Sequence, residues 1–366
     1  METIRNGYRF IKDKKRMMFF SMTFYADYYD SDGDGVVTVE DNLKEIETII
    51  EDGYIDSLYI HHVKEEDPDT IKRLRGVLRL CLKHNITCWL YCHPFYSKEE
   101  PIEDYFARVK RTTDEIKSIE GAWDIFSGFY WDEPFLNRQT NQDFHDLTKG
   151  LYEQYGKRLY TCFSSNMLCR GIANVCNIPQ EREIPEPWAV KYLTDAGWDN
   201  YAYDIRESVK GNKSQAERLQ QLSEGAGETF VTADDFYQFV QRKLVELFDH
   251  PINMWMYPCA YDAGTYSYLP VNEDYCVSQV DYFEKFLDET SEKYSHQSTA
   301  GMCMFTYNSR KFIGLVKRLP IKIDGKMLCT EEGFEDKWYD MDAAIRRVKK
   351  AYEDEGEVEL YAGFEI

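Results

Sequence analysis

The chain has 366 residues, 43% of them hydrophobic, and a formal net charge of −21 at pH 7. This length suits one large α/β barrel with long loops. An acidic surface repels phosphate backbones, and no apolar run approaches the roughly 18 residues of a membrane span. We therefore expect neither a nucleic-acid nor a membrane partner, while the oligomeric state stays open.

Short runs rich in aromatic and β-branched residues alternate with amphipathic segments along the chain, as expected of strands covered on both faces. The expected strands are Met18–Tyr25, Ser57–His62, Thr87–Cys92, Ser127–Trp131, Leu159–Ser164, Tyr201–Ile205, Asn253–Tyr257 and Met302–Tyr307. The expected helices are Val39–Glu51, Thr70–His84, Pro101–Ile119, Asn141–Tyr155, Ala233–Phe248, Asp274–Tyr294 and Asp340–Asp354.

Eight strands separated by helices predict a (β/α)8 barrel, and no low-complexity linker divides the chain. We expect residues 1–366 to form a single TIM-barrel domain with elaborated βα loops. The segment 169–200, which contains IPQEREIPEP, is expected to be an irregular loop that caps the barrel. A doubly wound open sheet is the alternative, but no glycine-rich phosphate loop follows the first strand.

Residues 30–41, DSDGDGVVTVED, have the spacing of a calcium-binding loop. Such a loop places oxygen ligands at defined positions and a glycine at its sharp turn. The metal ligands expected from this spacing are Asp30, Asp32, Asp34, Val36 (through its carbonyl), Thr38 and Asp41. The segment resembles EF-hand loops, and its closing aspartate resembles the dockerin type. The resemblance implies a structural Ca²⁺ between the first strand and the first helix; an acidic turn without metal is the alternative.

The cysteine pattern bears on the cellular compartment. Ten cysteines are scattered through the chain, none in a CxxC pair, and Cys162, Cys169 and Cys176 have no His or Cys partner at zinc spacing. Free thiols, and a segment Met1–Arg16 without the apolar stretch of a signal peptide, favour a cytoplasmic location. The calcium loop favours the alternative, an extracellular location, because weak loops of this type fill at extracellular ion levels.

Two adjacent carboxylates mark the expected end of strand four, in the sequence GFYWDEPF of residues 128–135. Barrel enzymes carry their chemistry at such strand ends. Asp132 and Glu133 repel each other, which raises the pKa of one of them and suits a general acid for glycoside cleavage. A salt-bridged, helix-capping turn is the alternative interpretation.

An Asp-Glu pair at the end of strand four resembles the retaining N-acetylhexosaminidases of glycoside hydrolase families 20 and 123, and the DEP ending is most similar to the second. In those families the Glu protonates the leaving oxygen, and the Asp orients the substrate's own 2-acetamido group, which attacks the anomeric carbon. The resemblance implies Glu133 as acid/base and Asp132 as the orienting residue. Strand seven ends in the run Trp255–Asp262, which offers no Glu and only Asp262, and this favours substrate assistance over an enzyme nucleophile.

Polar and aromatic residues at the other strand ends are expected to bind the sugar, because a pyranose needs hydrogen bonds beside flat apolar faces. The substrate-binding candidates are Asp27, His61, Tyr91, His93, Trp131, Tyr203, Asp204, Trp255, Tyr257, Tyr261, Asp262, Tyr307 and Asn308.

The expected function is hydrolysis of a glycoside, with a β-N-acetylhexosaminide as the expected substrate. Two other hydrolase classes are disfavoured: strand one lacks a His-x-His motif, none of the seven histidines lies in strands five or six, and no Gly-x-Ser-x-Gly elbow occurs. The alternative function is a non-catalytic carbohydrate-binding or assembly protein on a barrel scaffold. Asp132 and Glu133 distinguish the two, because a binding protein has no need of an acid with a raised pKa.

Overall fold

The structure is a computed structural model that describes the backbone of residues 9–11, 16–18, 20–22, 38–51, 57–65, 67–92, 101–135, 139–176, 178–198, 215–250, 252–256, 261–262, 298–304, 313–314, 322–323, 326–327 and 358–360.

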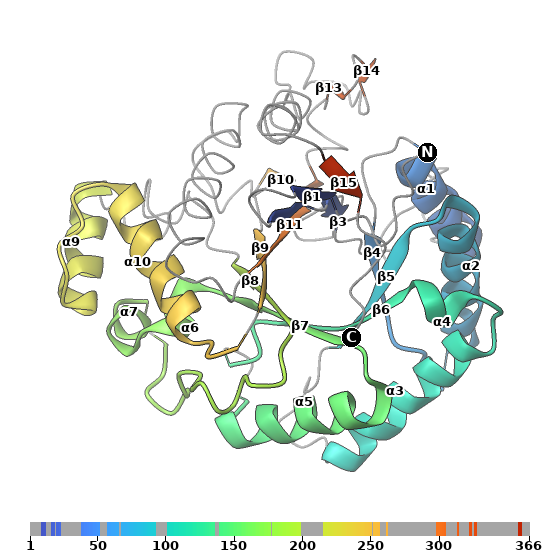
Figure 1. Ribbon diagram of the computed structural model, residues 1–366, viewed down its shortest axis with the longest axis horizontal. Helices are drawn as coiled ribbons and strands as arrows, with labels where there is room; N and C mark the ends of the chain where they lie inside the picture. Colours follow the sequence, from blue (N-terminus) through green and yellow to red (C-terminus); the bar gives the residue numbers. More distant parts are fainter. Residues whose placement is uncertain are drawn as a thin grey trace.

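Eight parallel strands form the centre of the molecule, and helices lie around them (Figure 1). The barrel strands in chain order are β3 (Phe20–Met22), β4 (Ser57–Ile60), β5 (Thr87–Tyr91), β6 (Phe126–Asp132), β7 (Arg158–Phe163), β8 (Asp195–Trp198), β9 (Asn253–Met256) and β11 (Ser298–Met304). Each strand pairs with the next in this order, and β11 pairs with both β9 and β3. The ring of pairings is therefore closed, and the predicted TIM barrel is confirmed.

The helices of the described part surround this ring. They are α1 (Val39–Glu51), α2 (Pro68–His84), α3 (Ile102–Lys117), α4 (Ala122–Ile125), α5 (Asn141–Tyr155), α6 (Ser165–Leu168), α7 (Arg170–Val175), α9 (Gln215–Ala226) and α10 (Ala233–Glu246). Capping chemistry sets the bounds of α5: Thr140 and Asp143 form a capping box at its start, and Gly156 ends it in the left-handed conformation.

Side chains alternate between the two faces of each strand, so each barrel strand contributes to two different cores. Leu58, Leu90, Phe129 and Leu159 belong to one buried hydrophobic cluster with the apolar faces of the helices. The residues between them point to the barrel axis. This second core is aromatic and polar, and it carries the candidate site.

Short antiparallel strands extend the barrel sheet. β1 (Arg9–Ile11) pairs with β2 (Arg16–Met18) and with β15 (Val358–Leu360), and β2 joins the start of β11. Two separate antiparallel pairs join β10 (Tyr261–Asp262) to β12 (Ile313–Gly314), and β13 (Lys322–Ile323) to β14 (Lys326–Met327).

The sixth barrel strand differs from the sequence-based prediction. It is Asp195–Trp198, whereas the predicted Tyr201–Ile205 lies outside the described residues. The segment 169–200 is accordingly not one irregular loop, since it contains helix α7 and this strand. The short run DAGW has no β-branched residue, so its strand character comes from pairing with β7 and β9 rather than from propensity.

Two other expectations can be compared with the described residues. The six cysteines described there are all free. Among the described helices, none has the length and apolar character needed to cross a bilayer. The predicted helices Asp274–Tyr294 and Asp340–Asp354 lie outside the described residues.

Candidate active site at the end of strand β6

Asp132 is the last residue of β6, at the carboxyl end of the fourth barrel strand, as the sequence predicts. Its side chain accepts two phenol hydrogen bonds. The Tyr130 hydroxyl donates to Oδ1 over 3.0 Å, and the Tyr91 hydroxyl donates to Oδ2 over 3.5 Å. Both Asp132 oxygens are therefore positioned by groups from two adjacent strands.

The two tyrosines are themselves held by packing. The Tyr130 ring lies 4.4 Å from the ring of Tyr59 and 5.5 Å from that of Tyr91, and His61 meets Tyr91 edge-on at 5.7 Å. Burial, with the Asp132 carboxylate adding to it, raises the pKa of Tyr130 well above its usual range. The Tyr130 hydroxyl thus stays protonated at neutral and mildly alkaline pH, and it remains a donor to Asp132.

Glu133 follows in a strained backbone conformation. Its φ is +41°, in the left-handed region that residues other than glycine rarely enter. Among described residues the only other non-glycine of this kind is Asn85, which caps a helix. The strain at Glu133 costs on the order of 1–3 kcal/mol, and such strain clusters at active sites.

The residues after Glu133 fix this turn. Pro134 and Phe135 are buried, and the Phe135 ring packs against Phe144 of α5 at 5.3 Å. The Gln139 amide donates to the Pro134 carbonyl over 3.3 Å. Glu133 is half-buried, and the residues that follow it in the turn are fixed by their packing against α5.

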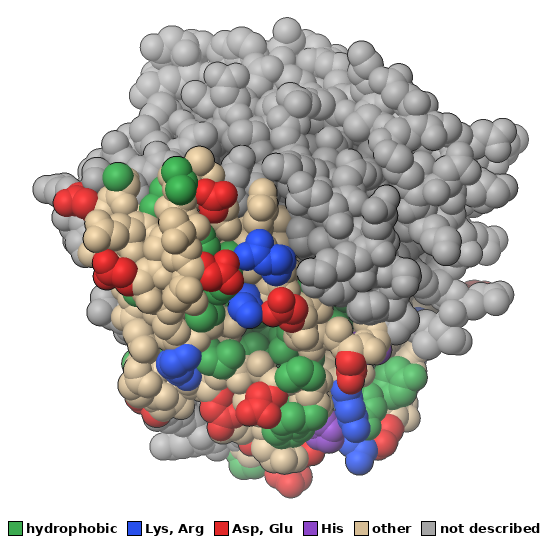
Figure 2. Space-filling model, turned by 60° about the vertical axis from the view of Figure 1, so that its left-hand side comes forward, with side chains coloured by type: hydrophobic (Ala, Val, Ile, Leu, Met, Phe, Trp, Pro, Cys, Tyr) green, Lys and Arg blue, Asp and Glu red, His purple; other side chains and the backbone are tan. Residues whose placement is uncertain are grey.

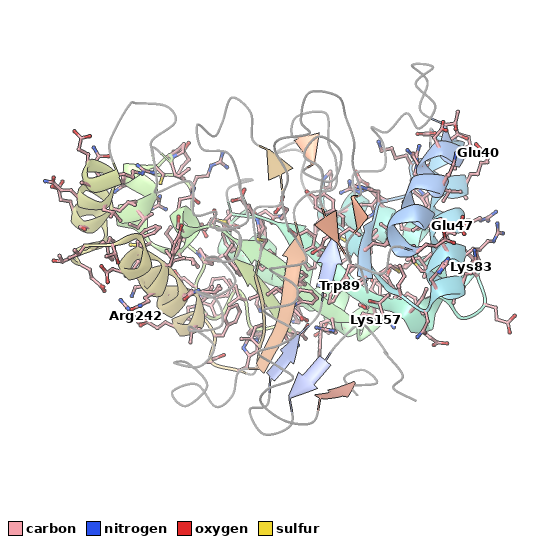
Figure 3. The ribbon with its side chains drawn as sticks, turned by 90° about the horizontal axis from the view of Figure 1, so that it is seen from above. Glu40, Glu47, Lys83, Trp89, Lys157 and Arg242 are labelled. Carbon is pink, nitrogen blue, oxygen red and sulfur yellow. The ribbon has the colours of Figure 1, made fainter. Side chains whose placement is uncertain are left out.

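Below Asp132 the barrel interior is filled by a second polar network. Asp195, fully buried, accepts from the Arg158 guanidinium through Nε at 2.9 Å and through Nη2, and from the Trp255 indole at 2.9 Å. The Trp255 ring stacks on Tyr160 at 5.0 Å, and Trp89 lies edge-on to both of these rings. Trp89 lies among the strands near the molecular centre, whereas Glu40, Glu47 and Lys83 are on outer helices (Figure 3). This network closes the barrel beneath the candidate site.

Two predicted substrate-binding residues lie elsewhere. Trp131 is fully buried on the outer face of β6, where its indole donates to the Tyr105 hydroxyl over 3.2 Å and its ring packs on Phe144. Trp255 is buried in the lower network, where it hydrogen-bonds Asp195. These placements contradict the expectation that either ring contacts substrate, because both are covered by protein.

Sequence reasoning missed Tyr130 and Tyr59, which hold the site together. The signal was present for Tyr130: a strand alternates with a period of two, so the residue two before Asp132 shares its face. The adjacent Trp131 then points to the opposite face. His61 and Tyr91, both predicted, do lie in the cluster around Asp132.

The remaining substrate-binding candidates are described in part or not at all. Tyr261 and Asp262 form β10, and their side chains lie outside the described part. Asp27, His93, Tyr203, Asp204, Tyr257, Tyr307 and Asn308 lie outside the described residues. Strand six, as described, ends at Trp198.

The predicted calcium loop is described only at its end. Asp30, Asp32, Asp34 and Val36 lie outside the described residues, while Thr38 and Asp41 hydrogen-bond each other at the start of α1. The Asp41 amide donates to Thr38 Oγ1 over 3.1 Å, and the Thr38 amide donates to Asp41 Oδ2 over 3.0 Å. This reciprocal pair is a capping box at the start of α1, and it uses one carboxylate oxygen of Asp41.

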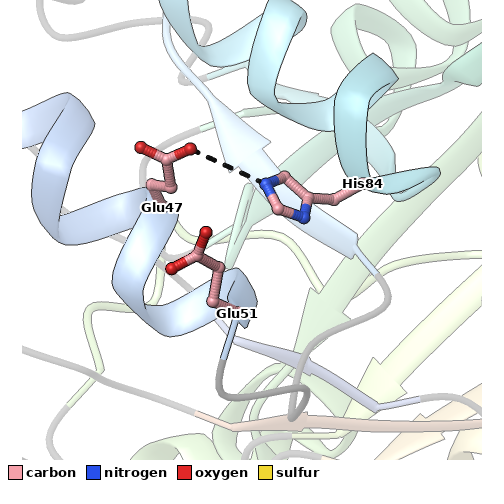
Figure 4. A group of neighbouring side chains, drawn as sticks. All are labelled: Glu47, Glu51 and His84. Atoms are coloured by element: carbon pink, nitrogen blue, oxygen red, sulfur yellow. Dashed lines mark ion pairs between the residues drawn. The ribbon is translucent and has the colours of Figure 1, made fainter.

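A second group of possible metal ligands lies on the outer surface, where Glu47 and Glu51 of α1 approach His84 of α2 (Figure 4). Their ligand atoms lie within 4.8 Å of one another. Glu47 already accepts from Lys83 over 2.5 Å, and this ammonium lowers the pKa of the Glu47 carboxyl. An ion-pair network between two helices accounts for the group.

Comparisons with known proteins give structural neighbours only. No family model matches the chain, and no curated protein matches it by sequence. A GH5_18 protein from Streptomyces cattleya, solved in complex with GlcNAc, is similar with a TM-score of 0.50 and 8% identity over 93% of this chain and 81% of that chain. A glycoside hydrolase family 5 enzyme from Prevotella bryantii B14, in complex with a xyloglucan tetradecasaccharide, has a TM-score of 0.46 and 10% identity over 96% of this chain and 99% of that chain. A family 5 xyloglucanase from Paenibacillus pabuli has a TM-score of 0.46 and 9% identity over 91% of this chain and 98% of that chain. At 8% identity the likeness to the Streptomyces cattleya protein shows a shared barrel fold and nothing finer.

Proposed function

We propose that the protein is a glycoside hydrolase with Glu133 as its acid/base and Asp132 as the residue that orients the reacting group. The observation that carries this proposal is the end of β6, where a strained Glu133 follows an Asp132 clamped by two tyrosines. A structural turn gains nothing from a left-handed glutamate, whereas an active site uses such strain to fix a reacting group.

The substrate proposed is a β-N-acetylhexosaminide cleaved with assistance from its own acetamido group. Glu133 would transfer its proton to the glycosidic oxygen as the bond to the anomeric carbon breaks, and the acetamido oxygen would attack that carbon. Asp132 would accept the acetamido N–H, a role that suits a carboxylate whose two oxygens are fixed by phenol donors. Water activated by Glu133 would then open the cyclic intermediate with overall retention of configuration.

Hydrolysis of aryl sugars by wild type and Glu133→Gln tests the proposal. We expect turnover of aryl β-N-acetylglucosaminide or β-N-acetylgalactosaminide, and a loss of about 10²–10⁴-fold in the variant. Plain aryl β-glucoside and β-galactoside serve as matched substrates without the acetamido group. The presence of GlcNAc in the Streptomyces cattleya structure makes this sugar the first to assay.

Each outcome decides a different part of the proposal. Turnover of plain sugars as fast as acetamido sugars would refute substrate assistance and leave a glycosidase with an enzyme nucleophile. Equal activity of wild type and Glu133→Gln would refute the role of Glu133. No turnover of any of the four sugars would favour a carbohydrate-binding protein.

We also propose that residues 30–41, which end in the first turn of α1, hold a structural Ca²⁺, on the strength of their ligand spacing. Calorimetric titration of chelator-treated protein tests this. We expect binding heat and a higher melting temperature with millimolar Ca²⁺, both lost in Asp32→Ala with Asp34→Ala. A melting temperature that does not respond to Ca²⁺ would leave residues 30–41 as an acidic turn ahead of the Thr38–Asp41 cap.

A further inference from the structure

Four rings form a continuous row on the outer wall of the barrel, away from the Asp132 cluster. The aromatic row consists of Tyr152, Tyr192, His145 and Trp188. Neighbouring ring centroids are 5.6, 5.5 and 5.6 Å apart in that order. Tyr152 and His145 belong to α5, where a spacing of seven residues places them on one helical face.

The row is open to solvent at both ends. Tyr152 is 40% exposed and Trp188 is 43% exposed, and they are two of the three large hydrophobic residues of the described part that are this accessible. Figure 2 shows one face on which hydrophobic side chains gather over the lower part of the described surface, with acidic and basic groups between them. Exposed rings of this kind, unlike scattered surface leucines, offer flat faces to a ligand.

The segment that carries Trp188 is held rigidly against α5. Asn141, at the first position of that helix, donates from Nδ2 to Glu183 Oε2 over 2.8 Å and to the Ile184 carbonyl over 3.0 Å. Its Oδ1 accepts from the Glu186 amide over 2.8 Å. Ala189 and Val190, the two residues after Trp188 in the chain, are fully buried. The rings therefore keep their spacing without a bound partner.

Polar groups border the rings. The Trp188 indole donates to Glu186 Oε2 over 2.5 Å, the His145 ring contacts Asp146 Oδ1 at 3.1 Å, and the Lys191 ammonium lies 4.9 Å from the Tyr192 ring centre. Carboxylates beside flat rings match a sugar, whose C–H face stacks on aromatics while its hydroxyls bond at the rim. The Lys191 ammonium, which lies over the Tyr192 ring, adds a hydrogen-bond donor.

Charge and area disfavour other occupants. The chain carries a net charge of −21, and Glu186 and Asp146 border the row, so an anionic polymer would be repelled. Two rings exposed by about two fifths present roughly 60–100 Å² each, given about 150–250 Å² for a whole aromatic side chain. A protein partner buries about 800 Å² per side in a standard interface, far more than this row offers.

We infer that the aromatic row is a second carbohydrate-binding site, which takes a run of neutral pyranose units from a polysaccharide or long oligosaccharide. The inference rests on the proposed action on carbohydrate, and it adds a site that holds the polymer outside the reaction centre. The two exposed rings at its ends, Tyr152 and Trp188, set two stacking positions along one chain of sugars.

Retardation of the full chain in native gels that contain glycol chitin or xyloglucan, both neutral and soluble, tests the inference. We expect retardation of wild type and about tenfold weaker apparent binding by the variant with Trp188→Ala and Tyr152→Ala, from the loss of two stacking contacts. Val231→Ala is the matched control, because Val231 is the third exposed large hydrophobic residue and does not belong to the row. Glu133→Gln is included so that hydrolysis of the gel matrix does not mask binding.

The outcomes separate this inference from the proposed reaction. Unchanged retardation of the double variant, or none of wild type in either polymer, would overturn it. A wild-type dimer in light scattering that the double variant abolishes would overturn it in favour of a second copy of the chain. Retardation that depends on the row, combined with no turnover of aryl sugars, would keep this site and favour a carbohydrate-binding protein over the hydrolase.

Discussion

The two ends of the barrel each contain an aspartate in an aromatic cage, but they hold it differently. At the amino end Asp195 is fully buried and faces the guanidinium of Arg158, with further bonds from Trp255 and Thr194. At the carboxyl end Asp132 is half-buried and receives the phenol hydroxyls of Tyr130 and Tyr91. The backbone is strained next to Asp132, at Glu133.

Under the proposed function, this difference assigns stability to the end around Asp195 and chemistry to the end around Asp132. A buried carboxylate that faces a cation and has both oxygens bonded is locked, since separating the pair would expose two charges to a low-dielectric interior. A carboxylate held by neutral donors near solvent keeps its position and can still meet a ligand. We call the amino end around Asp195 the closed end and the carboxyl end around Asp132 the open end. The two ends share residue types but not roles.

The largest expected effect is on the closed end. Asp195→Ala leaves the Arg158 charge buried without its partner, so we expect the free energy of unfolding to fall by about 3–5 kcal/mol. Urea denaturation measures this. The double variant with Arg158→Met and Asp195→Leu should recover most of the loss, because no charge is then buried. A loss below about 1 kcal/mol in Asp195→Ala would break the assignment of this end to stability.

The open end should respond in activity rather than in stability. Tyr130→Phe removes the 3.0 Å donor to Asp132, so we expect a rate loss of roughly 10- to 100-fold, the equivalent of one hydrogen bond to a charged group. The acid limb of the pH–rate profile should move to higher pH, because the charged carboxylate loses stabilisation. Tyr105→Phe, which changes a buried hydroxyl on the outer face, is the control and should not move that limb.

Gly128 connects the two ends. An added Cβ would lie 1.9 Å from the Arg158 carbonyl oxygen, so Gly128→Ala must displace β6 or β7. We expect a loss of about 1–3 kcal/mol in thermal unfolding, together with reduced activity because Asp132 ends the same strand. Gly156→Ala is the control: its Cβ would meet nothing within 4 Å, and its positive φ costs about 1–2 kcal/mol without touching the site.

The smallest expected effect concerns His62, beside the open end. Burial, with the charge of Arg108 adding to it, lowers the pKa of His62 well below the usual 6.5. The unfolded chain therefore binds a proton that the folded chain does not, so stability is lost as pH falls below about 6.5, by at most about 1.4 kcal/mol per pH unit. His62→Gln should flatten this dependence between pH 6.5 and 4.5. An unchanged slope would show that His62 does not control it.

The sequence by itself determined the architecture and the position of the acidic pair. Alternating strands and helices predicted the barrel, and Val39–Glu51 and Asn141–Tyr155 match α1 and α5 to the residue. Asp132 was placed at the end of the fourth strand because GFYWD is apolar and ends abruptly in carboxylates. These features depend on residues close together in the chain, so the sequence alone can predict them.

Only the tertiary structure decided what surrounds each of these residues. Strand alternation puts Trp131 and Tyr130 on opposite faces, but only the closed barrel brings Tyr105 to one and Tyr59 to the other. Strand β8 has weak propensity and exists because its neighbours pair with it. The row of Tyr152, Tyr192, His145 and Trp188 unites two chain segments that the sequence keeps apart. Contacts between distant segments depend on the closure of the barrel and on helix packing, and no local pattern encodes them.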